Sequence, residues 1–130
     1  YFETGYFIDG IRFLQEDIRN VQLAKAAVRA GIEVLLKSYA ISIDEVEQVF
    51  IAGGFGYNLD INKAAYIGLL PYQAAKKAKT LGNTALSGAV LASCDTRAKY
   101  RLDQIISVSK EIHLSDDKDF NDMFIKYISF

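Results

Sequence analysis

A strand that ends in a cluster of glycines constrains this chain most. The apolar run Val49–Ala52 leads directly into Gly53, Gly54 and Gly56. Residues of this kind favour a buried strand, and glycines permit a turn in which a flat ligand approaches the backbone without obstruction by Cβ atoms. Some α/β proteins receive a nucleotide at such a turn, and others use it as a tight turn without a ligand. The motif alone leaves both interpretations open.

The glycine spacing excludes two common nucleotide motifs. No Gly-Lys-Ser/Thr sequence follows the turn, so it is not a P-loop. The spacing also differs from the dinucleotide fingerprint G-x-G-x-x-G, and Asn58-Leu59-Asp60 interrupts the start of any following helix. If the turn binds a nucleotide, we expect the glycines to lie against the base and sugar rather than around the phosphates.

Composition narrows the class of protein. A chain of 130 residues that is 51% hydrophobic and contains one proline is typical of a single compact domain, here 1–130. A net charge of −1 gives no electrostatic case for binding nucleic acid or an anionic membrane. No apolar run reaches the roughly 20 residues of a membrane span. The single cysteine, Cys94, excludes an internal disulfide or a four-cysteine cluster site and favours a reducing, cytoplasmic setting.

Apolar periodicity predicts one long helix over residues 16–38. Apolar residues recur there at spacings of three and four, on one face: Ile18, Val21, Ala24, Val28, Ile32 and Leu35. Gln22, Lys25 and Arg29 form a polar stripe beside that face. Taken alone, such a stripe is a solvated helix edge.

Shorter signals predict the remaining elements. A capping box at Ser42–Glu45 predicts a short helix before the glycine strand. We expect helices over 62–70, from Asn83 or Thr84 to about 93, after Asp95-Thr96, and after 115–117. Strands are expected over 78–81 and 111–114. The aromatic segment 1–10 predicts a strand and turn that enter mid-fold, as in a piece of a longer protein.

Several segments together resemble one family, the reductive activators of corrinoid proteins, in its C-terminal part. The segments that carry the resemblance are Gln15-Glu16-Asp17-Ile18-Arg19, Gln22-Leu23-Ala24-Lys25-Ala26-Ala27, Ala30-Gly31-Ile32, Ile51-Ala52-Gly53-Gly54-Phe55-Gly56, Gly68-Leu69-Leu70-Pro71 and Gly82-Asn83-Thr84-Ala85-Leu86-Ser87-Gly88-Ala89. One departure is Leu14, where the family tends to have a capping threonine; Asp17 is the expected substitute cap.

The resemblance implies an α/β fold, a mixed sheet flanked by helices. It would be one lobe of an actin-like and sugar-kinase-like (ribonuclease H-like) ATPase. It implies that Gly53, Gly54, Phe55 and Gly56 form the adenosine motif and that the segment from Gly82 to Ala89 is a connecting helix. Nucleotide-binding roles are further implied for the stripe on helix 16–38: Gln22, Lys25 and Arg29. No catalytic or metal-binding residue is expected in this chain.

The function implied by the resemblance is that of a multidomain parent protein. It would use ATP and Mg²⁺ to drive electrons from a [2Fe–2S] cluster, in a separate N-terminal ferredoxin-like domain, to a Co(II) corrinoid. The implied partners are a corrinoid protein or its methyltransferase and the missing lobe of the same protein. The chain alone would lack the hydrolytic machinery. Two alternatives stay open: another phosphotransferase or a dehydratase activator of the same fold, and a non-catalytic docking module that forms a homodimer.

Overall fold

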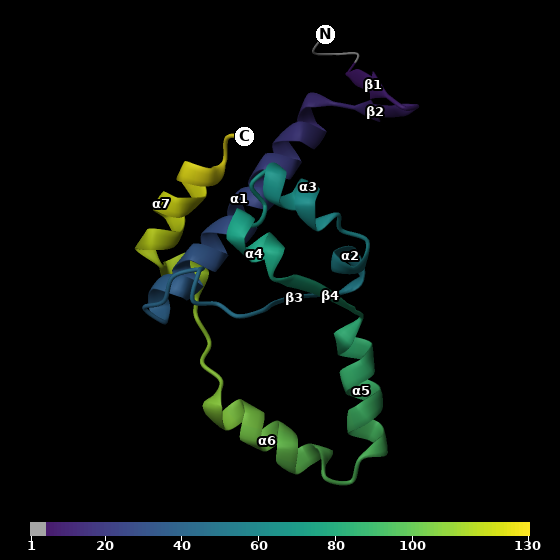
Figure 1. Ribbon diagram of the computed structural model, residues 1–130, viewed down its shortest axis with the longest axis vertical. Coiled ribbons are helices and arrows are strands. Elements are labelled where there is room, and N and C mark those ends of the chain that lie inside the picture. The colour runs from purple at the N-terminus through teal and green to yellow at the C-terminus, as the bar shows by residue number, and fades with distance from the viewer. Residues whose placement is uncertain (1–4) are drawn as a thin grey trace.

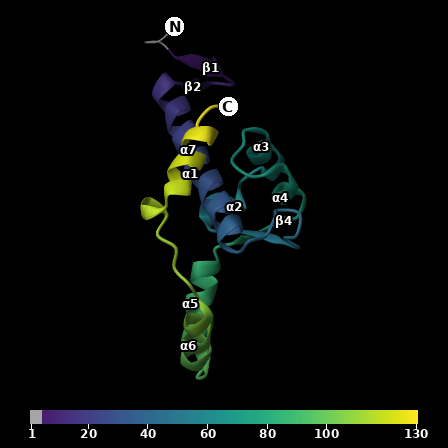
Figure 2. The same ribbon diagram turned by 90° about the vertical axis from the view of Figure 1, so that its left-hand side faces the viewer.

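A long helix, α1 (Gln15–Ser38), carries most of the packing in the computed structural model, which describes residues 5–130 (Figure 1). Its bounds confirm the helix predicted over 16–38. The C-terminal helix α7 (Lys118–Tyr127) runs alongside it, and the two make the most extensive contact between elements (Figures 1 and 2). The Asp17 carboxylate accepts a hydrogen bond from the Leu14 amide at 2.8 Å, so Asp17 does help to cap the helix start.

The buried face of α1 consists of small residues. Ala26, Ala30 and Val34 are at most 2% exposed, and Gly31 lies on the same side. The larger apolar residues of the predicted stripe remain about half exposed, for example Val28 at 46% and Leu35 at 48%. Small side chains let neighbouring segments approach the helix closely. The larger stripe is therefore only partly covered by the described residues.

The four strands within residues 5–130 form two separate pairs. β3 (Val49–Ala52) and β4 (Ala78–Gly82) are parallel, with Ile51 opposite Thr80 and an irregularity that then places Ala52 opposite Gly82. Three short helices connect them: α2 (Gly54–Tyr57), α3 (Ile61–Tyr66) and α4 (Tyr72–Lys76). Both predicted strands are therefore confirmed, and they pair with each other.

The second pair of strands is an antiparallel hairpin of β1 (Tyr6–Ile8) and β2 (Ile11–Phe13). Its turn residues have positive φ, 49° at Asp9 and 79° at Gly10, as a two-residue hairpin turn that follows the strand twist requires. The expected aromatic strand thus begins at Tyr6; the part of that prediction on residues 1–4 lies outside the described residues.

Two helices project from the rest as an arm (Figures 1 and 2). They are α5 (Thr84–Cys94) and α6 (Ala98–Val108), and neither has a buried residue. Helix α5 contains no charged residue over its 11 positions, and Leu86, Val90 and Leu91 are all more than half exposed. A helix without charged residues on any side is normally buried on all sides. Among the described residues, nothing buries α5 in this way.

Two predicted elements are wrong. Ser42 and Glu45 do form the capping hydrogen bond, from the Ser42 amide to the Glu45 carboxylate at 2.7 Å, but only a turn follows. The ammonium of Lys77 donates hydrogen bonds to the backbone carbonyls of Asp44, at 2.7 Å, and Val46, at 2.6 Å. These bonds hold the turn in place. The strand expected over 111–114 is irregular chain that leads into the 3₁₀ turn η1 (Leu114–Asp116).

The remaining helices are present with adjusted ends. Helix α3 ends at Tyr66 rather than at Leu70, because Gly68 takes a positive φ of 83°. Asn83 caps α5 through a bond from the Leu86 amide, as predicted. Asp117 caps α7 in the same way, through the Asp119 and Phe120 amides.

The two helical glycines of α2 provide a test of this packing. A Cβ added at Gly56 would lie 2.5 Å from Cγ2 of Ile51, whereas one at Gly54 would meet nothing within 4 Å. We therefore expect Gly56→Ala to lower the free energy of unfolding by about 1–3 kcal/mol through overpacking. Gly54→Ala is the matched control and should leave it nearly unchanged. Urea denaturation of both variants measures the difference; equal stabilities would contradict the packing described.

Candidate functional site

The carboxyl ends of the two parallel strands meet at a pair of glycines. Gly53 directly follows β3 and has a φ of +99°, and Gly82 is the last residue of β4 and has a φ of +70°. The Gly53 amide donates a hydrogen bond to the Gly82 carbonyl at 2.7 Å. Helix α2 begins directly after Gly53, and α5 begins after Asn83. Ligands of open α/β sheets bind at this edge, where strands end and helices start. The edge is therefore the first candidate site.

The glycines at this edge differ in how much room they leave. Gly54 is exposed and has open space where a Cβ would stand. Gly56 is buried against Ile51, and Gly53 needs its positive φ. Phe55, between them, exposes 78% of its surface. Gly54 and the Phe55 ring are thus the parts of the motif that a flat ligand can reach.

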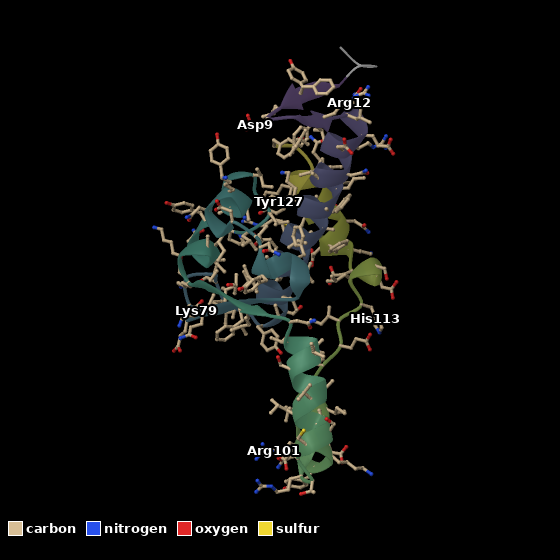
Figure 3. The ribbon with its side chains drawn as sticks, turned by 90° about the vertical axis from the view of Figure 1, so that its right-hand side faces the viewer. Asp9, Arg12, Lys79, Arg101, His113 and Tyr127 are labelled. Atoms are coloured by element: carbon tan, nitrogen blue, oxygen red, sulfur yellow. The ribbon has the colours of Figure 1, made fainter. Side chains whose placement is uncertain are left out.

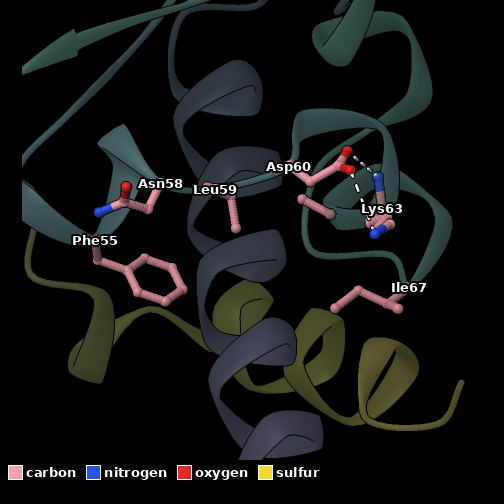
Figure 4. Close-up of a pocket in the computed structure, with 7 residues that line it drawn as sticks. Phe55, Asn58, Leu59, Asp60, Lys63 and Ile67 are labelled. Atoms are coloured by element: carbon pink, nitrogen blue, oxygen red, sulfur yellow. Dashed lines mark hydrogen bonds and ion pairs between the residues drawn. The ribbon is translucent and has the colours of Figure 1, made fainter. Parts of the chain in front are cut away.

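A hollow of about 350 Å³ lies beside the motif (Figure 4). Phe55, Leu59 and Ile67 give it an apolar lining, and Asn58, Asp60 and Lys63 add polar groups. The Lys63 amide donates to the Asp60 carboxylate at 3.0 Å, and this bond holds the pKa of Asp60 below its ordinary value. An aromatic ring next to an amide and a carboxylate suits a planar ligand that carries hydrogen-bond donors. Sequence reasoning missed Asn58 and Asp60 as lining residues, because it treated them only as helix breakers.

The polar stripe of α1 faces helix α7. Lys25 is only 3% exposed, and its ammonium donates to the carbonyls of Tyr127 and Ser129. Desolvation by burial lowers the pKa of Lys25. Lys25 is therefore not part of a solvated helix edge.

The neighbouring residues of the stripe join the same contact. Arg29 pairs with Glu33 at 2.8 Å and lies 4.7 Å from the centre of the Tyr127 ring. The Tyr127 hydroxyl donates to the same Glu33 carboxylate at 3.3 Å, at the place where α7 passes α1 (Figure 3). Glu33 could have been found from the four-residue spacing of Lys25, Arg29, Glu33 and Lys37, which puts charged groups on one helix edge. No signal in the sequence near α1 points to Tyr127, which lies 94 positions after Glu33.

Gln22 lies apart from these contacts. It lines a larger hollow of about 1030 Å³ along the first half of α1, together with Ile128 and Ser129. Phe55 of the glycine motif and Gln22 of the α1 stripe thus line different hollows of the described structure. The predicted site residues fall into two groups, Gly53–Gly56 on one side and Gln22, Lys25 and Arg29 on the other.

Residues 5–130 contain neither a metal-binding cluster nor a helix that could cross a membrane. Within that range, no group of three or more histidine, cysteine, aspartate or glutamate side chains is arranged to hold a metal ion. In the same part of the chain, no helix is both long and apolar enough to cross a membrane.

The contacts between α1 and α7 differ in burial, which allows a test. Glu33 holds both Arg29 and Tyr127 in a half-buried position, so we expect Glu33→Gln to cost about 1–2 kcal/mol of unfolding free energy. Lys37 pairs with Asp119, but the two side chains are 64% and 45% exposed, so Lys37→Met should cost at most about 0.5 kcal/mol. Thermal unfolding compares the two variants, and a larger loss for Lys37→Met would refute this ranking.

Comparison with known proteins identifies relatives over most of the chain. The chain is 34% identical over 111 residues to the corrinoid activation enzyme RamQ of Eubacterium limosum, covering 85% of this chain and 19% of the relative. It is 29% identical over 126 residues to the [Co(II) methylated amine-specific corrinoid protein] reductase of Methanosarcina barkeri, covering 93% of this chain and 23% of the relative. The chain therefore spans about a fifth of the length of these relatives.

A solved structure confirms the fold. The reductive activator for corrinoid,iron-sulfur protein matches with a TM-score of 0.81 at 34% identity, over 89% of this chain and 18% of that one. The model of the family described as the C-terminal domain of RACo, the ASKHA domain, matches residues 3–130. ASKHA domains have the actin-like ATPase fold, so the expected α/β fold class is confirmed. The chain belongs to the family of C-terminal ASKHA domains of RACo.

Proposed function

We propose that this chain is the C-terminal ATP-binding lobe, a single domain, of a larger cytoplasmic protein that reductively activates corrinoid proteins. The parent protein returns the Co(II) corrinoid of a methyl-transfer protein to Co(I). Family membership and the relatives named for corrinoid activation and Co(II) corrinoid protein reduction support this proposal. The observation that carries the ATP part is the open glycine motif at the carboxyl edge of β3 and β4.

The proposed nucleotide site is built from both groups of residues. The base and sugar lie against Gly53, Gly54 and Gly56, with Phe55 beside the ring. Gln22, Lys25 and Arg29 flank the base from α1. Lys25 and Arg29 now contact α7, so they reach a nucleotide only after exchanging those contacts. We assign the phosphate loops and the Mg²⁺ ligands to the rest of the parent protein.

The need for ATP is thermodynamic. One electron passes from a reduced [2Fe–2S] cluster to Co(II), which becomes Co(I). The reduction potential of the Co(II)/Co(I) couple is too low for an ordinary ferredoxin donor. ATP can close the gap only if it favours one conformation of the complex over another. With one cysteine, the sequence cannot supply the thiolates of such a cluster. We therefore place the cluster in an N-terminal domain of the parent.

Substitution at Gly54 tests the nucleotide site without disturbing the fold. A Cβ added at Gly54 would meet nothing within 4 Å, so we expect a larger side chain to obstruct the ligand without overpacking the fold. We expect Gly54→Val in the parent protein to weaken ATP binding at least about tenfold, or about 1.4 kcal/mol, and Gly54→Ala to weaken it less. Titration calorimetry measures the affinity, and thermal unfolding verifies that both variants fold. Unchanged affinity in Gly54→Val would refute the adenosine motif.

The reduction itself is tested in the intact parent with its corrinoid protein. The Co(II) and Co(I) forms have different visible spectra, so conversion can be followed directly. We expect conversion to require both the reduced cluster and ATP, and to fall in Gly54→Val in parallel with ATP binding. Conversion that proceeds at the same rate without ATP would rule out the proposed role of the nucleotide.

A second proposal concerns the exposed apolar surface. Helix α5 carries no charge and has no buried residue, and the large apolar stripe of α1 is half exposed. We propose that both pack against the missing lobe of the parent protein, with α5 as the connecting helix. The share of the relatives that this chain spans, 19% and 23%, leaves ample chain for such a lobe.

A charged residue on α5 tests this contact. Leu91 is 69% exposed in the chain, so Leu91→Glu should leave the chain folded, yet it would bury a carboxylate in the parent. We expect the parent's unfolding temperature to fall by about 2 °C or more. Gln104→Glu on α6 adds the same charge at a polar position and should have little effect. A nucleotide-independent dimer of the chain in native mass spectrometry would instead favour a second copy as the partner.

A further inference from the structure

The hollow beside the glycine motif has one polar lining residue, Asn58, whose side chain makes no hydrogen bond within residues 5–130. The other two polar lining residues are Asp60 and Lys63. The Asp60 carboxylate accepts a hydrogen bond from the Lys63 amide at 3.0 Å, and its second oxygen lies 3.7 Å from the Lys63 ammonium. These two residues thus engage each other, whereas the exposed Asn58 side chain is available to a ligand in the hollow.

The backbone fixes Asn58 beside the exposed ring of Phe55. Asn58 is the residue at which helix α2 ends, and its amide donates a hydrogen bond to the Phe55 carbonyl at 3.3 Å. Both residues line the hollow. Figure 4 shows Phe55 and Asn58 on one side of it and the pair of Asp60 and Lys63 on the other. A planar ligand that stacks on the Phe55 ring would therefore meet the Asn58 side chain at its edge.

A side-chain amide distinguishes between the two purine bases at one of their edges. It carries an acceptor oxygen and a donor NH₂ group next to each other. Adenine presents a donor, its N6 amine, beside an acceptor, N7, so an asparagine binds both atoms at once. Guanine presents two acceptors there, O6 and N7, and the amide oxygen would face an acceptor. An asparagine at this edge therefore favours adenine.

We propose that Asn58 selects the base of the nucleotide: its side-chain amide accepts a hydrogen bond from the N6 amine of adenine and donates one to N7, while the base stacks on the Phe55 ring. This inference rests on the proposed function and adds to it the residue that recognises the base. Stacking on Phe55 contributes affinity for any base, because every base has a π face. Asn58 supplies the preference for adenine.

The contact is tested by titration calorimetry of the parent protein with ATP, GTP and 7-deaza-ATP, in which a C–H group replaces N7. We expect the parent to bind ATP at least about tenfold more tightly than either of the other two nucleotides. In Asn58→Ala we expect ATP to bind about tenfold less tightly, and no more tightly than 7-deaza-ATP. The φ of −96° at position 58 suits alanine, so this variant should keep the fold, which thermal unfolding verifies.

Two further variants separate the edge contact from stacking. Asn62→Ala removes an exposed amide of α3 that does not line the hollow, and it should keep the preferences of the unmodified parent. Phe55→Ala should weaken all three nucleotides alike, because stacking does not depend on the edge of the base. If the parent binds ATP but Asn58→Ala leaves the ratio of ATP to 7-deaza-ATP affinity unchanged, the role of Asn58 is overturned and the proposed function stands. Absence of ATP binding to the folded parent would overturn both.

Discussion

The contact between α1 and α7 is the interaction on which the rest of the structure depends. Lys25, Arg29, Glu33 and Lys37 follow one another at intervals of four along α1, and each contacts α7 or the residues after it. Side chains four apart share one helix edge. This ridge joins two segments separated by about a hundred positions in the sequence, as the 102-residue separation of Lys25 and Tyr127 shows. It adds charged and aromatic contacts to the small apolar residues that α1 buries, Ala26, Ala30 and Val34.

The apolar residues are distributed accordingly. The buried apolar residues are few and mostly small, such as Ala26, Ala30 and Ala74, while many larger ones are exposed. Soluble proteins rarely leave extended apolar surface without a partner. The exposed stripe of α1 and the uncharged helix α5 therefore have the character of internal surfaces. The glycine edge of β3 and β4 lies between these two segments in the chain order.

Local signals predicted much of the fold, and long-range contacts were the part that they could not predict. The period of α1, the caps at Asn83 and Asp117 and the run Val49–Ala52 each specify an element within a few residues. The expected strand at 111–114 is irregular, and the strands of the described residues pair only with one another, β1 with β2 and β3 with β4. For the site, the sequence located the open glycine turn. It could not show that Lys25 contacts Tyr127, because nothing local records a partner so distant in the chain.

The uncharged surface of α5 has a practical consequence for handling this chain. Its 11 residues include no charged side chain, and the helix projects on the α5–α6 arm. Chaperones bind to exposed apolar surface of this kind, and aggregates form through it. Polar substitutions at exposed apolar positions of α5, such as Leu91, would therefore remove surface through which copies of this chain can aggregate.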